Sequence, residues 1–230
     1  MTQLLPTLEL LSLHVPKCGG SALGTALRNV YSDALLEDYA DRPGDPASPM
    51  NMDPDGFYAR TRDSLPALLR GKRAVHGHFH PKKYQPLRAT FRMAIIREPI
   101  ARLVSHYHYW KTSPRHGHCL HDYFLERDLD LEAFARLPLI RRFYTGVFFA
   151  GMTLNDFDFI GQQEDLSKAV ARLAQSIGRP LQLGVEKKRD TPEYNRAIAE
   201  IGYDSALRDR LASLLADDIR FYDSVRHRWT

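Results

Sequence analysis

The sequence has 230 residues, 43% hydrophobic and 26% charged, and its 32 basic and 28 acidic side chains leave a net charge of +4. This composition excludes a disordered or fibrous chain, and the charge suits an anionic ligand but is too weak to indicate nucleic acid. Two cysteines are too few for a disulfide framework and indicate a reducing compartment. A strand that begins by about residue 8 leaves no room for a signal peptide or a membrane anchor. We therefore expect a single cytoplasmic domain over residues 1–230, with no nucleic-acid partner and no membrane anchor.

The predicted elements begin with a strand, a glycine loop and a helix. An apolar run ends at Val15, the residues PKCGGS follow, and apolar residues then recur at helical spacing as far as Tyr31. Two adjacent glycines and the unpaired N–H groups of a helix start suit an anion, Lys17 adds a positive charge, and Ser21 is expected as the helix N-cap. The alternative is an ordinary strand–helix turn. Because the lysine precedes the glycines, the loop differs from the loop that binds nucleoside triphosphates.

Residues 41–55 are dense in proline, glycine and aspartate, so they predict a long surface loop that is either a mobile connector or part of a binding cleft. A short helix is expected over Thr61–Leu69. The next stretch, Ala74–Pro81, reads as a strand in which alternate residues share one face. Three histidines would then point the same way: His76, His78 and His80. By residue type alone they could be metal ligands, a general-base cluster or a polar strand edge.

A second strand-to-helix junction follows this histidine stretch. Thr90–Ile96 predicts a buried strand, and Pro99 opens a helical pattern. Arg97 stands at the carboxyl end of the strand, where ligands of open α/β sheets collect, and its planar guanidinium suits a phosphate. Ser105 lies two turns further along the helix. The alternative is a strand-terminal arginine paired with Glu98.

The rest of the chain predicts packing elements. Residues 112–121 combine three histidines with Cys119, and we favour a solvated or acceptor-facing loop over a metal site. Further expectations are short helices over 122–149, a strand at Phe157–Gly161, a helix ended by Gly178, a strand at Leu181–Val185 and a final helix over Ser205–Val225 that packs in the core and carries no site. Alternating strands and helices predict an α/β fold with a central, mainly parallel sheet flanked by helices.

Three of these stretches resemble one known family. HVPKCGGSAL at residues 14–23 resembles the 5′-phosphosulfate loop of sulfotransferases that use 3′-phosphoadenosine-5′-phosphosulfate (PAPS). IIREPIARLVSHYHY resembles their 3′-phosphate motif, with Arg97 and Ser105 at the matching spacing, and His76-Gly77-His78 is similar to a His-Gly-His of the heparan sulfate 2-O-sulfotransferase branch. The resemblance implies a P-loop-like three-layer fold and, since no anchor is expected, a bacterial relative of the carbohydrate sulfotransferases.

The same resemblance implies transfer of the sulfuryl group of PAPS to a hydroxyl of a carbohydrate or other small acceptor, with 3′-phosphoadenosine-5′-phosphate (PAP) as product and no metal. His78, with His76 orienting it or replacing it, would be the general base, and Lys17 would stabilise the bridging oxygen. Arg97 and Ser105 would hold the 3′-phosphate. The remaining cofactor contacts would come from the first loop and from a basic loop that closes over the nucleotide: Pro16, Lys17, Cys18, Gly19, Gly20, Ser21, Ala22, Lys188 and Arg189.

Two other functions stay open. A nucleotide kinase with an aberrant phosphate loop would bind ATP with magnesium, but the displaced lysine and the lack of a convincing strand ending in a magnesium-binding aspartate disfavour it. A non-catalytic anion-binding or glycan-binding module is disfavoured because the expected catalytic positions are all present.

Overall fold

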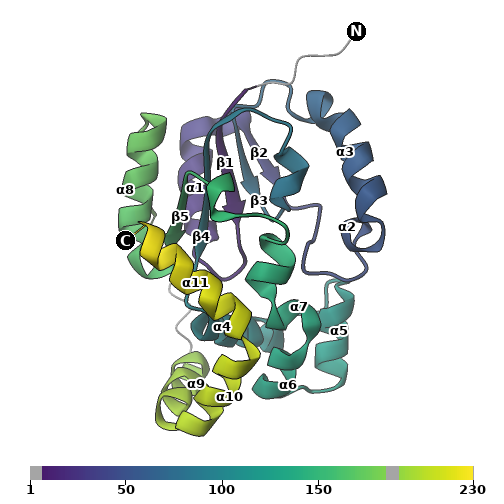
Figure 1. The fold of residues 1–230 in the computed structure, drawn as a ribbon, viewed down its shortest axis with the longest axis vertical. Helices are drawn as coiled ribbons and strands as arrows, with labels where there is room; N and C mark the ends of the chain where they lie inside the picture. Colours follow the sequence, from purple (N-terminus) through teal and green to yellow (C-terminus); the bar gives the residue numbers. More distant parts are fainter. Residues whose placement is uncertain (1–6, 185–191, 230) are drawn as a thin grey trace.

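The structure is a computed structural model that describes residues 7–184 and 192–229, and its centre is a five-stranded sheet (Figure 1). The strand order is β2-β3-β1-β4-β5, and all four pairings are parallel. The strands are β1 (Leu8–His14), β2 (Leu35–Asp38), β3 (Ala74–Gly77), β4 (Ala89–Ile96) and β5 (Phe159–Gln162). The predicted α/β fold with a parallel central sheet flanked by helices is confirmed.

Helices surround the sheet and extend beyond one of its ends. α1 contacts β2 and β3, α8 contacts β4 and β5, and α11 contacts β5. The helices are α1 (Gly20–Tyr31), α2 (Pro49–Met52), α3 (Pro54–Leu68), α4 (Pro99–Thr112), α5 (Cys119–Glu126), α6 (Leu131–Arg136), α7 (Pro138–Arg141), α8 (Leu166–Ile177), α9 (Pro192–Tyr203), α10 (Ser205–Leu214) and α11 (Ala216–Trp229). A π-helix, η3 (Phe143–Phe148), follows α7. Within the described ranges, no helix has both the length and the apolar character that crossing a membrane requires.

The central strand β1 sets the register of the site. Its sequence LELLSLH is nearly all buried, as a parallel strand covered on both faces requires. Ser12 of β1 pairs with His76 of β3 on one side, and His14 pairs with Ile95 of β4 on the other. Because the strands are parallel, their carboxyl ends lie at the same end of the sheet. The glycine loop after β1, the histidine stretch after β3 and Arg97 after β4 therefore all lie at that end. Beyond that end lie α4 to α7, α9 and α10 (Figure 1).

The prediction that residues 41–55 form no regular element is wrong beyond Ser48. Ser48 caps α2 by accepting from the Asn51 N–H, and Asp53 caps α3 by accepting from the Gly56 N–H. Each cap is followed by a proline, and proline fits the first helical position as well as it fits a loop. For the same reason α3 begins at Pro54, earlier than the helix expected over Thr61–Leu69.

Other boundaries also differ from the expectations. Gly178 ends α8 with a left-handed φ of 65°, as predicted, and the predicted strand near Phe157 is β5. The strand predicted over Leu181–Val185 is wrong for Leu181–Gly184, which pair with no strand of the described sheet. Val185 lies outside the described residues. The single C-terminal helix expected over Ser205–Val225 is two helices, α10 and α11, separated at Leu215.

Candidate active site

The glycine loop turns sharply between β1 and α1. Lys17 has a φ of 68° and Gly19 a φ of 80°, both left-handed. α1 begins at Gly20 with Gly19 as its N-cap, so the prediction of Ser21 as N-cap is wrong: Ser21 is exposed in the first turn. In the described structure no side chain caps this helix, which leaves its first N–H groups available to an anion.

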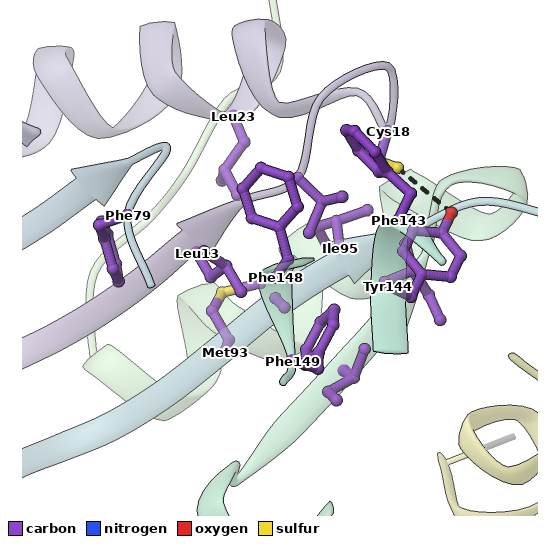
Figure 2. Close-up of a cluster of buried hydrophobic side chains, with 14 of the residues drawn as sticks. Leu13, Cys18, Leu23, Phe79, Met93, Ile95, Phe143, Tyr144, Phe148 and Phe149 are labelled. Carbon is purple, nitrogen blue, oxygen red and sulfur yellow. Dashed lines mark hydrogen bonds between the residues drawn. The ribbon is translucent and has the colours of Figure 1, made fainter. Parts of the chain in front are cut away.

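Two residues of the loop, Gly20 and Cys18, are also required for packing. A Cβ on Gly20 would lie 1.9 Å from Cδ2 of His14, so a glycine is needed for the His14 ring. The Cys18 side chain is fully buried, with its Sγ 3.6 Å from Oη of Tyr144 (Figure 2). Burial raises the pKa of the Cys18 thiol to about 11. Only the backbone of Cys18 is therefore suited to a cofactor.

A cluster of four rings lies beside this loop, formed by His14, Tyr39, His76 and His78. The His14 ring stacks on His76 with centroids 5.1 Å apart and meets His78 edge-on at 4.4 Å. Nδ1 of His14 is 3.0 Å from Oη of Tyr39, whose ring lies 4.8 Å from His78. Sequence reasoning missed His14 as a site residue. The signal was present, because Ser12 and His14 are polar residues two apart in an apolar strand and so share one face.

His76 is held by both ring nitrogens. Its Nδ1 lies 2.9 Å from Oγ of Ser12, and its Nε2 lies 3.2 Å from the carbonyl oxygen of Gly20. A carbonyl can only accept, so Nε2 carries the hydrogen and Nδ1 accepts from the Ser12 hydroxyl. The ring is fully buried, and burial lowers the pKa of His76 to about 4. His76 is therefore a fixed, neutral group that ties β1 and the start of α1 to β3.

His78 differs from His76 in its hydrogen bonding. Its Nε2 is buried and has no hydrogen-bond partner among the described residues. Burial, followed by the electrostatic interaction with the His76 ring, which disfavours protonation of both, lowers the pKa of His78 to about 4. The ring is neutral at neutral pH, and its Nε2 is a buried nitrogen whose hydrogen-bonding capacity no described residue uses.

The expectation that three histidines share one face is wrong for His80. β3 ends at Gly77, so the alternation of side chains does not continue. Nδ1 of His80 accepts from the Lys82 N–H, and its ring lies near that of Tyr58, 6.1 Å away. Gly77 itself allows the backbone of β2 to approach, because a Cβ there would lie 1.9 Å from the carbonyl oxygen of Asp38.

Arg97 follows β4 directly. Its Nη2 donates to Oη of Tyr194 in α9 over 2.7 Å. The Glu98 carboxylate instead caps α4, accepting from the N–H groups of Ile100 and Ala101 at 3.0 and 2.7 Å. The alternative of an Arg97–Glu98 pair is therefore wrong in the part of the chain that the structure describes, where these two side chains have different partners.

Helix α4 brings the second motif toward the first. Ser105 is half-buried, and Tyr109 stands four residues later on the same helical face. Nζ of Lys17 lies 4.2 Å from the centre of the Tyr109 ring. The lysine of the glycine loop and the face that carries Ser105 are thus adjacent. Lys188 and Arg189 lie outside the described residues.

The stretch 112–121 is more firmly anchored than a solvated loop. His121 is fully buried in α5, its Nε2 lies 2.9 Å from the carbonyl oxygen of Trp110, and its Nδ1 lies 3.2 Å from Nδ1 of His116. The Cys119 thiol donates to Oδ1 of Asp45 over 3.2 Å. The expectation is therefore wrong for His121, and these side chains join α5 to the 41–48 segment. Among the residues with described positions, no three His, Cys, Asp or Glu side chains are arranged to hold a metal ion.

Comparison with known proteins places these motifs in context. The chain is similar to a solved sulfotransferase from Alicyclobacillus acidocaldarius, with 16% identity, 91% of this chain and 96% of that chain covered, and a TM-score of 0.40. It is also similar to mouse sulfotransferase SULT7A1 complexed with PAP, with 12% identity, 89% and 87% covered, and a TM-score of 0.36. No curated protein matches the chain. The model of the sulfotransferase family matches residues 4–128, more than half of the sequence, and the chain therefore belongs to the sulfotransferase family.

Proposed function

We propose that this sulfotransferase uses PAPS and transfers its sulfuryl group to a hydroxyl of a carbohydrate acceptor, with His78 as general base. The observation that carries the proposal is the arrangement at one end of the sheet. Two neighbouring strands, β1 and β4, are each followed by a cation, Lys17 three residues after β1 and Arg97 directly after β4. His78, neutral and with an Nε2 that has no hydrogen-bond partner among the described residues, follows β3 on the other side of β1.

The residues of both motifs fit a ligand with two separate phosphates. The first position offers Lys17 and the N–H groups at the start of α1, and the second offers the Arg97 guanidinium and the Ser105 hydroxyl. Every one of these groups can donate a hydrogen bond, as anionic oxygens require. Among adenine nucleotides, phosphates at both the 3′ and 5′ positions distinguish PAPS from ATP.

When bound, PAPS supplies an activated sulfuryl group whose transfer leaves negative charge on the 5′-phosphate. Lys17 and the N–H groups at the start of α1 would stabilise that charge. Arg97 and Ser105 would orient the nucleotide through its other end. His78 would accept the proton from the acceptor hydroxyl at Nε2, since the ring is neutral and this atom makes no hydrogen bond to a described residue.

The hydrogen bonds support His78 over His76 as the base. Both nitrogens of His76 are engaged with groups of β1 and α1, so accepting a proton would cost one of those bonds. His76 instead fixes the His14 ring, and one side of that ring meets His78. Negative charge arriving beside His78 would raise its pKa toward the working range of a base.

Two further parts of the proposal concern the acceptor and the domain. The similarity of His76-Gly77-His78 to the heparan sulfate 2-O-sulfotransferase branch supports a carbohydrate acceptor. Tyr39, 38% exposed and adjacent to His78, offers an aromatic surface where that acceptor would lie. We also propose that residues 1–230 form one domain, which is supported by the contact of α11 with β5.

The test is calorimetric titration with PAP, and separately with ATP and magnesium. We expect a clear preference for PAP. Replacing Arg97 by alanine should weaken PAP binding by about 10–100-fold, since a hydrogen bond to a charged group contributes about 1.5–3 kcal/mol. Arg28→Ala is the matched control, because Arg28 is a half-exposed arginine of α1 paired with Glu37. Preference for ATP would overturn the proposal in favour of a nucleotide kinase.

A further inference from the structure

The two phosphate-binding motifs are joined by one buried hydroxyl group. Oη of Tyr144 accepts from the backbone N–H of Arg97 over 3.0 Å and donates to the carbonyl oxygen of the same residue over 2.6 Å. On its other side the same oxygen lies 3.6 Å from Sγ of Cys18 in the glycine loop (Figure 2). The Tyr144 hydroxyl hydrogen is used by the Arg97 carbonyl, so a bond between the hydroxyl and Cys18 requires the Cys18 S–H as donor. The carbonyl oxygen of Pro16, 3.5 Å from the same Sγ, also accepts from this S–H, so the thiol hydrogen is shared between the loop backbone and Tyr144.

The protonation states agree with this arrangement. Burial raises the pKa of the Cys18 thiol to about 11, so the sulfur keeps the hydrogen that it donates. Burial also raises the pKa of Tyr144 well above its ordinary value, so the hydroxyl keeps the hydrogen that it donates to the Arg97 carbonyl. Both groups therefore stay neutral over the working range, and the bridge does not depend on pH there.

Tyr144 is itself held rigidly from behind. Its backbone N–H donates to Oδ2 of Asp218 over 2.8 Å, and the N–H and hydroxyl of Thr145 donate to Oδ1 over 2.9 Å each. Asp218 belongs to α11 and is fully buried. The guanidinium of Arg102 covers the Tyr144 ring at 5.8 Å. Asp218 therefore fixes Tyr144 from outside both motifs, while Arg102 belongs to the second motif, and the tyrosine can act as a rigid spacer between the two motifs.

We propose that Tyr144 is a positioning residue that sets the separation between the 5′-phosphosulfate loop and the 3′-phosphate motif. The proposal rests on the proposed use of PAPS. A ligand with two linked phosphates gains affinity over a ligand with one only when both sites stand at the correct separation, because the second contact is then intramolecular. A preorganised spacing also avoids the ordering cost of bringing two loops together on binding. Tyr144 would thereby determine the preference for a 3′,5′-bisphosphate over either monophosphate.

The test compares three probes by calorimetry: PAP, adenosine 5′-phosphate and adenosine 3′-phosphate. In Tyr144→Phe we expect PAP affinity to fall by about tenfold or more, while each monophosphate loses less than about threefold. Tyr84→Phe is the matched control. Tyr84 is equally buried, and its hydroxyl donates to Oδ2 of Asp38 over 2.7 Å, away from both motifs. It should lose stability but keep wild-type affinity for all three probes.

Each outcome separates the possible explanations. Equal losses for all three probes in Tyr144→Phe, or an unchanged preference for PAP, would overturn the positioning role while leaving the proposed function intact. A wild-type protein with no preference for PAP would overturn the proposed function and this role with it. If Tyr144→Phe does not fold, Cys18→Ala is the second variant, because it removes the contact between Sγ of Cys18 and Oη of Tyr144. We expect it to lower the preference for PAP over the monophosphates by about threefold. An unchanged preference in Cys18→Ala would also refute the positioning role. In a folded Tyr144→Phe protein, hydrogen exchange at the Arg97 amide should accelerate, and in Tyr84→Phe it should not.

Discussion

Because the His14 ring lies close to Gly20, the effect of Gly20→Ala on the free energy of unfolding can be estimated from the structure. In Gly20→Ala the new Cβ would lie 1.9 Å from Cδ2 of His14 and 2.2 Å from its Nε2, far inside van der Waals contact. The ring has little room to move, because it lies between His76, His78 and Tyr39. We expect the full overpacking cost of about 3 kcal/mol. The helix propensity of alanine would offset up to about 1 kcal/mol of it.

The net result should be a loss of about 2 kcal/mol in the free energy of unfolding, or roughly 30-fold in the unfolding equilibrium. The melting temperature should fall by about 4–8 °C for a chain of this size. Urea unfolding followed by tryptophan fluorescence measures the effect, since Trp110 is only 4% exposed and reports on the core beside the site.

Gly24→Ala is the matched control one helical turn later. There the Cβ would lie 3.1 Å from Nε2 of His76, a tight contact that a shift of a few tenths of an ångström relieves. Its stability should stay within about 1 kcal/mol of wild type, because the helix propensity of alanine opposes the strain. If Gly20→Ala is as stable as Gly24→Ala, the stacked arrangement of His14 over the helix start is refuted.

Two further predictions concern the histidines. His78→Ala should lower sulfuryl transfer by about 10²–10⁴-fold and leave PAP affinity within about twofold of wild type, and a loss of binding of the same size would argue against a role in proton transfer. Acid should also destabilise the protein. Burial lowers the folded-state pKa of His76, His78 and His80 to about 4. Between pH 6.5 and 4 the unfolded chain therefore binds more protons than the folded chain, and the free energy of unfolding falls as the pH falls. Burial also lowers the pKa of His14, His106 and His118, which adds to this trend. Asp41, whose pKa burial raises to about 6, and Asp218, whose pKa burial also raises, oppose it over part of the range. Urea midpoints at pH 7.5, 6.0 and 4.5 measure the slope, and a midpoint that rises with acid would contradict the burial of these rings.

Local patterns were sufficient to predict the elements that carry the motifs. The apolar run of β1, the glycine loop and the helical spacing of α1 are all contained within Leu8–Tyr31, and β4 with α4 is equally local. These signals arise from side-chain periodicity and from proline and glycine geometry, which act over a few residues. The prolines at Pro49 and Pro54 show the limit of this reasoning, because the same residue type marks a loop and starts a helix.

The parts of the site that sequence reasoning missed come from distant segments. Tyr144 contacts Cys18 across 126 residues and Arg97 across 47, and Asp218 holds Tyr144 from a helix that was predicted to carry no site. No periodicity or short motif links such positions, since they meet only through the tertiary fold. The sequence also could not predict which of His76 and His78 keeps a ring nitrogen without a partner, because that depends on the contacts of His76 with Ser12 and Gly20 in the folded chain.

The position of β1 in the sheet also determines when the site can form during synthesis. β1 precedes the other four described strands of the sheet, yet both of its neighbours, β3 and β4, come much later in the chain, and the contact of Ser12 with His76 spans 64 residues. At about 5–20 residues per second, the ribosome needs roughly 3–13 s to supply that partner. Throughout this interval the apolar strand has no partner on either edge and is open to association with other nascent chains. Because pairing over such separations also carries a large loop-closure entropy, the phosphate loop reaches its final geometry late in folding.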